Sequence, residues 1–127
     1  MRNEDKARCW WSLPGGGVKR RETLFEAAIR EVKEETGLDV QILDLARLYE
    51  FIGIQPNAHA LSATFRAEVI GGTLKPQDPV NAVKQVSWVT VESCSELLVD
   101  EFANFAREVL TGICGGATYH MKRENTE

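Results

Sequence analysis

The feature that most constrains this chain is a glycine-rich turn that leads directly into a charged helix. Residues 14–17 (PGGG) predict a turn, because glycine adopts backbone angles that other residues avoid. Thr23 is placed to cap a helix that runs to about Thr36, and Glu26 completes a capping-box pattern. Gly37 is placed to end this helix in the left-handed conformation. The sequence therefore predicts a loop, a helix and a second turn near the start of the chain.

The helix has two neighbouring faces of opposite character when its residues are placed at 100° intervals. One is an apolar stripe of about 100°, which suits packing against a sheet. The other holds three glutamates, and uncompensated like charges at this spacing cost roughly 0.2–0.5 kcal/mol per pair. Such a face is often merely solvated, but it can also bind a divalent cation, since Mg²⁺ takes carboxylate oxygens and substrate phosphates as ligands. The stripe comprises Phe25, Ala28, Ile29 and Val32, and the glutamates are Glu31, Glu34 and Glu35.

The residues around these glutamates favour the metal-binding interpretation. They fit the pattern G-x5-E-x7-R-E-U-x-E-E-x-G-U, in which U is aliphatic. Seven fixed residues match by chance on the order of 10⁻⁸ times per starting position. The stretch resembles the Nudix box, the signature of hydrolases that act on a nucleoside diphosphate linked to another moiety. The matching residues are Gly16, Glu22, Arg30, Glu31, Val32, Glu34, Glu35, Gly37 and Leu38.

The resemblance continues on both sides of the box. The residues from Trp11 to Gly16 look like the W-x-L-P-G-G motif that precedes the box in this family. Phe65, the two glycines at 71–72 and the Trp88-Val89 pair resemble later strands more weakly. The clear match covers about residues 11–38, and the weaker pattern extends to about residue 110.

The resemblance implies a site that binds Mg²⁺ or Mn²⁺ together with a small nucleotide substrate. Glu31, Glu34 and Glu35 match metal-ligating positions of the family, with help from the backbone carbonyl of Gly16. Arg30 matches the arginine that holds the glutamates by charge-assisted hydrogen bonds. The implied reaction is attack of water on a pyrophosphate phosphorus, which releases a nucleoside monophosphate and a phosphorylated partner. Substrate contacts are expected from Gly15, Gly16, Arg20 and Glu22.

Two roles stay open at this stage. Glu31 or Glu34 is expected to accept the proton of the attacking water, because the run before Trp88 (NAVKQVS) lacks the glutamate that related sequences often carry there. Three carboxylates outside the box remain as substitutes: Asp78, Glu92 and Asp100. The basic run at residues 19–21 (KRR) can either meet phosphates or be a solvated loop.

The fold class expected from this pattern is α/β, and the resemblance implies a Nudix-like α/β/α sandwich with a mixed sheet between helices. Strands are expected at residues 38–54, 59–70 and 82–91, with some helical ambiguity at Leu45–Leu48 and a hairpin turn at residues 71–72. Ser93 or Ser95 is placed to cap a final helix that Gly112 ends. We expect one domain over residues 1–112 and a flexible C-terminal tail over residues 113–127.

Composition limits the compartment and the partners. A net charge of −4 argues against a protein that coats long nucleic acids. Three cysteines without CxxC spacing indicate reduced thiols and a cytoplasmic location rather than a disulfide framework or zinc site. No apolar run approaches the roughly 20 residues that a membrane span needs, and the N-terminus lacks the apolar core of a signal peptide.

The start of the sequence departs from the family pattern. Family domains usually have about two strands before the W-x-L-P-G-G motif, whereas only MRNEDKARC precedes Trp10 here. This segment looks like the loop that follows such a strand, so the fold is expected to be shortened at its N-terminus. A sheet that lacks a central strand exposes unpaired edges and apolar faces, which predicts a homodimer. The alternative to an enzyme is a truncated, catalytically weak module that binds nucleotides or partners.

Overall fold

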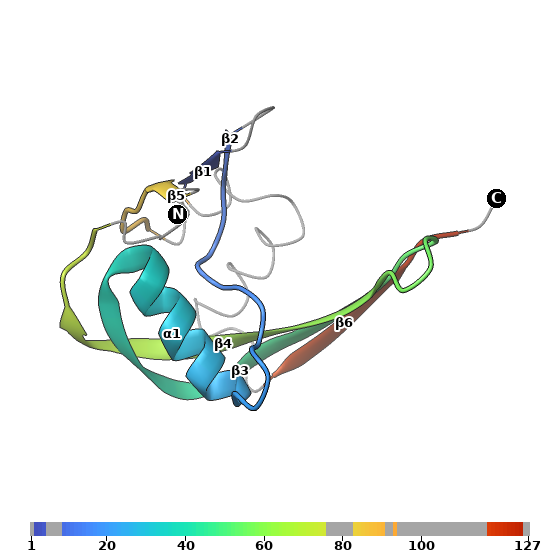
Figure 1. Cartoon of the computed structure of the whole chain (residues 1–127), viewed down its shortest axis with the longest axis horizontal. Coiled ribbons are helices and arrows are strands. Elements are labelled where there is room, and N and C mark those ends of the chain that lie inside the picture. Colours follow the sequence, from blue (N-terminus) through green and yellow to red (C-terminus); the bar gives the residue numbers. More distant parts are fainter. Residues whose placement is uncertain (1, 5–8, 76–82, 91–92, 94–116, 126–127) are drawn as a thin grey trace.

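The computed structural model describes residues 2–4, 9–75, 83–90, 93 and 117–125, which form one helix and six strands. The helix follows the glycine-rich loop, and the two longest strands come directly after it (Figure 1). Among the described residues, no helix is both long and apolar enough to cross a membrane. The elements are β1 Arg2–Glu4, β2 Cys9–Trp11, α1 Leu24–Thr36, β3 Leu38–Ile52, β4 His59–Gly72, β5 Val83–Gln85 and β6 Thr118–Arg123.

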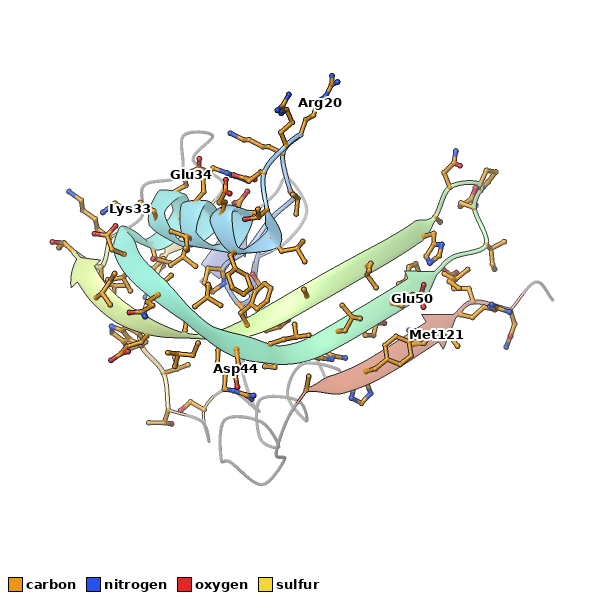
Figure 2. All side chains as sticks on the ribbon, turned by 90° about the horizontal axis from the view of Figure 1, so that it is seen from below. Arg20, Lys33, Glu34, Asp44, Glu50 and Met121 are labelled. Atoms are coloured by element: carbon orange, nitrogen blue, oxygen red, sulfur yellow. The ribbon has the colours of Figure 1, made fainter. Side chains whose placement is uncertain are left out.

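The described strands form two three-stranded sheets. In the larger sheet the order is β4-β3-β6, with β3 antiparallel to β4 and parallel to β6, so this sheet is mixed. In the smaller sheet the order is β2-β1-β5, and both pairings are antiparallel. Strands β3 and β4 make a long curved ribbon, with β6 along its far part and α1 inside its bend (Figures 1 and 2).

Helix α1 begins and ends as its sequence predicts. The Thr23 hydroxyl oxygen accepts a hydrogen bond from the Glu26 N–H at 3.0 Å, and the Gly37 N–H donates to the Lys33 carbonyl at 3.0 Å. Gly37 adopts the left-handed conformation, with φ of 81°. These contacts satisfy backbone groups that have no partner inside the helix, so both boundaries of α1 are fixed locally.

The core of the described region lies between α1 and β3. Ala27 on α1 and Ala46 on β3 are 4% and 1% exposed, and Leu38 and Val40 are also buried. The predicted apolar stripe is only partly covered, because Phe25 remains 52% exposed although its ring meets the ring of Phe65 edge-on at 5.1 Å. Ala27 is the most buried residue of the helix, although it lies outside the predicted stripe.

The helix is joined to the sheet by a close backbone approach at Gly72. This glycine has φ of +83°, and it pairs with Leu38 at the start of β3. A Cβ atom there would overlap the carbonyl oxygen of Gly37 and lie 2.9 Å from the Asp39 nitrogen. The Thr73 N–H then donates to that same Gly37 carbonyl at 3.2 Å. The end of β4 therefore packs directly on the turn that ends α1.

Both long strands match the sequence-based prediction, and the ambiguous Leu45–Leu48 stretch is strand. The predicted hairpin turn at residues 71–72 is wrong, because these glycines are the last residues of β4 and pair with Asp39 and Leu38. The β3–β4 connection is the turn at residues 53–58, between the two strands expected from the sequence, and it closes with a hydrogen bond from the Gly53 N–H to the Ala58 carbonyl.

Three further expectations need correction or fall outside the described residues. The N-terminal segment is not only a loop, because β1 and β2 pair antiparallel there. The strand expected at residues 82–91 is limited to β5, and β6 lies within the expected flexible tail. Ser93 is helical, but its N–H donates to the Thr90 hydroxyl oxygen at 3.2 Å, so Thr90 makes the contact typical of a cap. The remainder of the expected final helix lies outside the described residues.

Gly72→Ala is expected to lower the free energy of unfolding by about 2 kcal/mol or more, because it combines a positive φ with a backbone collision. Gly71→Ala is the matched control, since a Cβ there would lie 3.4 Å from the nearest atom, an Asp39 carboxylate oxygen. Urea unfolding followed by circular dichroism measures both variants. Equal stabilities for the two variants would contradict the proposed junction.

Candidate active site

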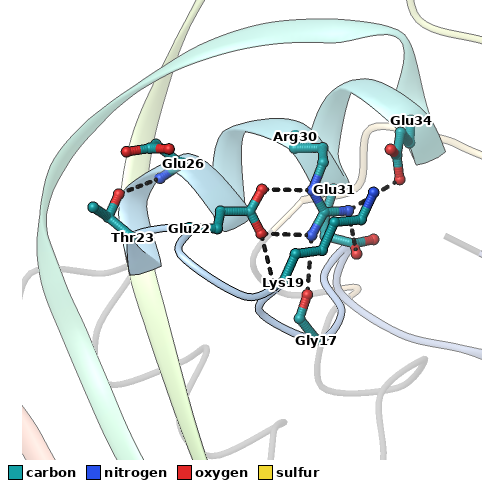
Figure 3. A network of polar contacts seen from close by, with 8 residues as sticks. All are labelled: Gly17, Lys19, Glu22, Thr23, Glu26, Arg30, Glu31 and Glu34. Atoms are coloured by element: carbon teal, nitrogen blue, oxygen red, sulfur yellow. Dashed lines mark hydrogen bonds and ion pairs between the residues drawn. The ribbon is translucent and has the colours of Figure 1, made fainter.

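The glycine-rich loop and α1 bring the predicted site residues together. The loop runs from β2 to the Thr23 cap, and α1 presents Arg30 and the glutamates toward it (Figure 3). A turn closes the loop just before the helix, with the Glu22 N–H donating to the Lys19 carbonyl at 3.1 Å. Because the cap fixes the first residue of the helix, it also fixes the position of the charged face of α1 relative to the loop.

Arg30 is the centre of the polar network that joins the loop to the helix. Its Nε–H and Nη2–H groups donate to the two carboxylate oxygens of Glu22 at 2.7 and 2.9 Å. Nη1 donates to Glu31 at 2.8 Å and to Glu34 at 3.2 Å, and Nη2 donates to the Gly17 carbonyl at 3.0 Å. An arginine side chain has five N–H donors, and these five contacts use all of them. The guanidinium is therefore held in a single orientation.

Glu22 is the strongest partner of Arg30. The two parallel hydrogen bonds form a fork that matches a planar guanidinium to a planar carboxylate. The Lys19 N–H adds a third hydrogen bond to the same carboxylate at 3.0 Å. The bond to Arg30, followed by the backbone bond from Lys19, lowers the pKa of Glu22 to about 2. Contacts with Glu22 and then Glu31 raise the pKa of Arg30 above its already high ordinary value, so both groups stay charged.

Two more glutamates lie against the backbone of the loop. The Gly15 N–H donates to a carboxylate oxygen of Glu35 at 2.9 Å. The carboxylate of Glu31 occupies the space where a side chain at Gly16 would stand, since a Cβ there would lie 2.5 Å from its carboxyl carbon. Glycine at position 16 is thus required for the close approach of Glu31 to the loop.

The network confirms that Arg30 contacts Glu31 and Glu34, as the sequence predicted. Glu26, which also lies one turn from Arg30 on α1, makes no such contact. Arg20 lies at the exposed end of the loop and projects away from the network (Figure 2). Asp78, Glu92 and Asp100, the alternative bases, lie outside the described residues.

Sequence reasoning missed the bidentate partner of Arg30. A helical wheel places only residues of α1, and Glu22 precedes the Thr23 cap by one residue. The Lys19 N–H and the Gly17 carbonyl are backbone groups, so the identity of those residues gave no signal. The signal that pointed to Glu22 was its place in the Nudix-box pattern, and the turn at residues 19–22 brings it to Arg30.

The donor set of this site fits a hard divalent cation. Three carboxylates, those of Glu22, Glu31 and Glu34, share the single positive charge of Arg30, so negative charge exceeds positive charge within these ion pairs. The Glu35 carboxylate lies against the loop backbone at Gly15. Carboxylate and carbonyl oxygens are the ligands that Mg²⁺ and Mn²⁺ prefer. In the described residues, however, no three acidic, histidine or cysteine side chains already converge on a single point. The site has the chemistry for a metal ion, but its glutamates are arranged around Arg30.

Comparisons with known proteins agree with this geometry. The chain is 44% identical over 68 residues to the ADP-ribose pyrophosphatase of Methanocaldococcus jannaschii, a match that covers 54% of this chain and 40% of that protein. It is 30% identical over 102 residues to a MutT-like protein of Streptomyces ambofaciens, covering 80% of this chain and 62% of the relative. The chain thus spans between two-fifths and two-thirds of the length of these relatives.

A solved NUDIX hydrolase from Nitrosomonas europaea has the same fold, with a TM-score of 0.61 at 19% identity over 97% of this chain and 69% of the other. This likeness shows that the fold is the α/β Nudix fold expected from the sequence. A family model described as the NUDIX domain matches residues 1–112. Because that match covers most of the chain and includes the whole Arg30 network, the chain belongs to the NUDIX domain family.

Proposed function

We propose that this chain hydrolyses the pyrophosphate bond of a nucleoside diphosphate linked to another moiety, with Mg²⁺ or Mn²⁺ as its cofactor. The observation that carries the proposal is the Arg30 network, which fixes Glu31 and Glu34 beside the glycine-rich loop. Such a network has little use in a protein that needs the helix only for packing. The name of the pyrophosphatase relative supports the same reaction class.

The cofactor would be held by Glu31, Glu34 and Glu35, together with the backbone carbonyl of Gly16. When bound, a divalent cation neutralises phosphate charge and makes the attacking water more acidic. The hard oxygen ligands and the surplus of negative charge in the network support this assignment.

The chain's own residues then have separate tasks in the reaction. Arg30 holds Glu31 and Glu34 in place, and Gly15 and Gly16 let the backbone come close to the phosphates. An oxygen of water forms a bond to one phosphorus while the bridging oxygen leaves with the other phosphoryl group. Glu31 or Glu34 accepts the proton of the water, since each has a carboxylate oxygen within this arrangement. The products are a nucleoside monophosphate and a phosphorylated partner.

The test is chromatographic detection of the cleavage products of ADP-ribose, NADH, dinucleoside polyphosphates and nucleoside triphosphates, with Mg²⁺ and after its removal by a chelator. We expect hydrolysis of at least one substrate only with the metal. Glu34→Gln and Glu35→Gln should each lower turnover by about 10²–10⁴-fold. The fold should persist, because glutamine still offers an oxygen to the Gly15 N–H that Glu35 binds.

Glu26→Gln is the matched control for these variants, because Glu26 lies on the same helix and its carboxylate is outside the Arg30 network. Its turnover should stay within about twofold of the wild-type value. If both site variants keep near-wild-type turnover, the assignment of these glutamates is wrong. If the wild-type chain hydrolyses nothing in the panel, the alternative of a nucleotide-binding module is favoured.

Arg30→Lys should lower kcat by about 10²-fold while raising KM much less, since small displacements of catalytic groups have costs of this size. Lysine keeps the charge but has three donors, whereas Arg30 makes five contacts. Lys33→Arg is the control, because Lys33 pairs with Asp39 at the other end of α1 and should tolerate the change. Steady-state kinetics separate the two parameters, and an effect on KM alone would refute a positioning role.

The homodimer expected from the sequence is part of this proposal. Strand β4 forms one edge of the described β4-β3-β6 sheet, and Leu61 and Ile70 on it are exposed. Open edges pair readily with other chains, and a charge placed on the edge blocks this. Light scattering should show a dimer that Ile70→Lys converts to a monomer. Leu43→Lys, an equally exposed position on central strand β3, should leave the dimer intact, and a wild-type monomer would contradict the proposal.

A further inference from the structure

Three consecutive cations lie at the end of the glycine-rich loop, where the Arg30 bond and, to a smaller extent, the charge of Lys19 lower the pKa of Glu22. We call Lys19, Arg20 and Arg21 the basic turn; all three are exposed. Within the described part of the chain, none of their side chains forms an ion pair. The nearby carboxylates are engaged by Arg30 and by backbone N–H groups instead. The positive charge of the basic turn is therefore available to a ligand.

The basic turn is held firmly beside the carboxylate network. Glu22 donates its N–H to the Lys19 carbonyl, and its carboxylate accepts the Lys19 N–H, so the turn is closed from both sides. Arg30 binds the same Glu22 carboxylate and also the Gly17 carbonyl just before the turn. These contacts fix the backbone that carries the cations relative to Glu31 and Glu34. Because the Arg20 side chain extends outward from the network (Figure 2), a phosphate group bound there lies farther from these carboxylates than the pyrophosphate that is cleaved.

Arg21 has a backbone conformation that its side chain disfavours. Its φ is 68°, in the left-handed region. Residues with a Cβ atom are uncommon in this region, whereas glycine adopts it without steric cost. A turn that served only to connect two elements would be more stable with glycine at this position. Residues held in such conformations cluster at binding and active sites, and a binding role for the Arg21 side chain would account for arginine at this position.

We infer that the basic turn binds phosphate groups beyond the pyrophosphate that is cleaved, so that the preferred substrate is a nucleotide with three or more consecutive phosphates. The inference rests on the proposed function, which places the cleaved pyrophosphate at the neighbouring carboxylates. A nucleoside triphosphate or a dinucleoside polyphosphate carries the additional charge, whereas ADP-ribose has only the cleaved pyrophosphate. A long nucleic acid fits less well, because such ligands typically engage about 6–10 phosphates and the chain has a net charge of −4.

The experiment compares kcat/KM for ATP with kcat/KM for ADP-ribose in the same protein. The double variant Arg20→Gln and Arg21→Gln should lower this ratio by about tenfold, because two exposed charge contacts are lost. The matched control is Lys75→Gln with Arg123→Gln, which removes the same charge at exposed positions outside the loop and should leave the ratio within about twofold. High salt should reduce the wild-type ratio as well, since exposed charges are screened.

Arg21→Gly separates a binding role from a structural one. Glycine suits the positive φ, so the melting temperature should be equal or higher while the ATP to ADP-ribose ratio falls by about threefold. A lower melting temperature with an unchanged ratio would show that the arginine serves the fold. Equal ratios in the wild type and the double variant would overturn the inference and leave the hydrolysis itself established.

A binding measurement decides the inference even if no substrate is cleaved. Calorimetry with inorganic triphosphate and inorganic pyrophosphate, at one fixed Mg²⁺ concentration, gives two dissociation constants for each protein. The inference is supported if the wild type and the control bind triphosphate more tightly than pyrophosphate and the double variant does not. Equal constants for both ligands in the wild type refute it. If none of the nucleotide substrates is hydrolysed, only the proposed function is refuted.

Discussion

The contacts of one guanidinium group determine the geometry of the whole site. Arg30 connects a carboxylate before the helix, two carboxylates on the helix and a carbonyl in the glycine-rich loop. Without it, the three carboxylates of Glu22, Glu31 and Glu34 would have no shared cation between them, and their repulsion would favour an open loop. The positive charge alone is not sufficient, because a point charge has no fixed directions. The planar, five-donor fork sets both the distances and the orientations.

The network works because the backbone around it is fixed at three places. Thr23 sets the first turn of α1, Gly37 ends the helix, and Gly72 packs on that end from the neighbouring strand. Two of these positions are glycines with positive φ, and a side chain at Gly72 would collide with the backbone that ends the helix. The position of the carboxylates therefore depends on contacts at the far end of α1 as well as on Arg30, which links the stability of the sheet to the geometry of the site.

Local signals in the sequence were sufficient for much of this structure. The caps of α1, the long strands β3 and β4, and the contacts of Arg30 with Glu31 and Glu34 depend on neighbouring residues and on helical spacing. Non-local pairings could not be predicted in this way. The glycines at 71–72 have the composition of a hairpin turn, but Gly72 closely approaches Gly37, which lies 35 positions earlier in the chain.

Strand β6 shows the same limit for a polar segment. Its residues were expected to belong to a flexible tail, yet they pair in parallel with the far part of β3. The Tyr119 hydroxyl donates to a Glu50 carboxylate oxygen at 2.6 Å, and the other oxygen of that carboxylate lies 2.6 Å from the His59 ring on β4. Strand β6 is thus joined to β3 and β4 by polar contacts and not by an apolar face. Hydrophobic periodicity detects apolar faces, so it gave no signal for this strand.

The low pKa of Glu22 has a consequence for how the site responds to pH. A carboxyl group whose pKa is depressed on folding stabilises the protein fully above its ordinary pKa, and this stabilisation is lost as the pH falls through the folded value. For Glu22 the ordinary value is 4.5 and the folded value is about 2, with the bond to Arg30 as the main cause. The Arg30–Glu22 pair therefore keeps both charges throughout the neutral range. Any pH dependence of hydrolysis near neutrality must then arise from a group other than this pair.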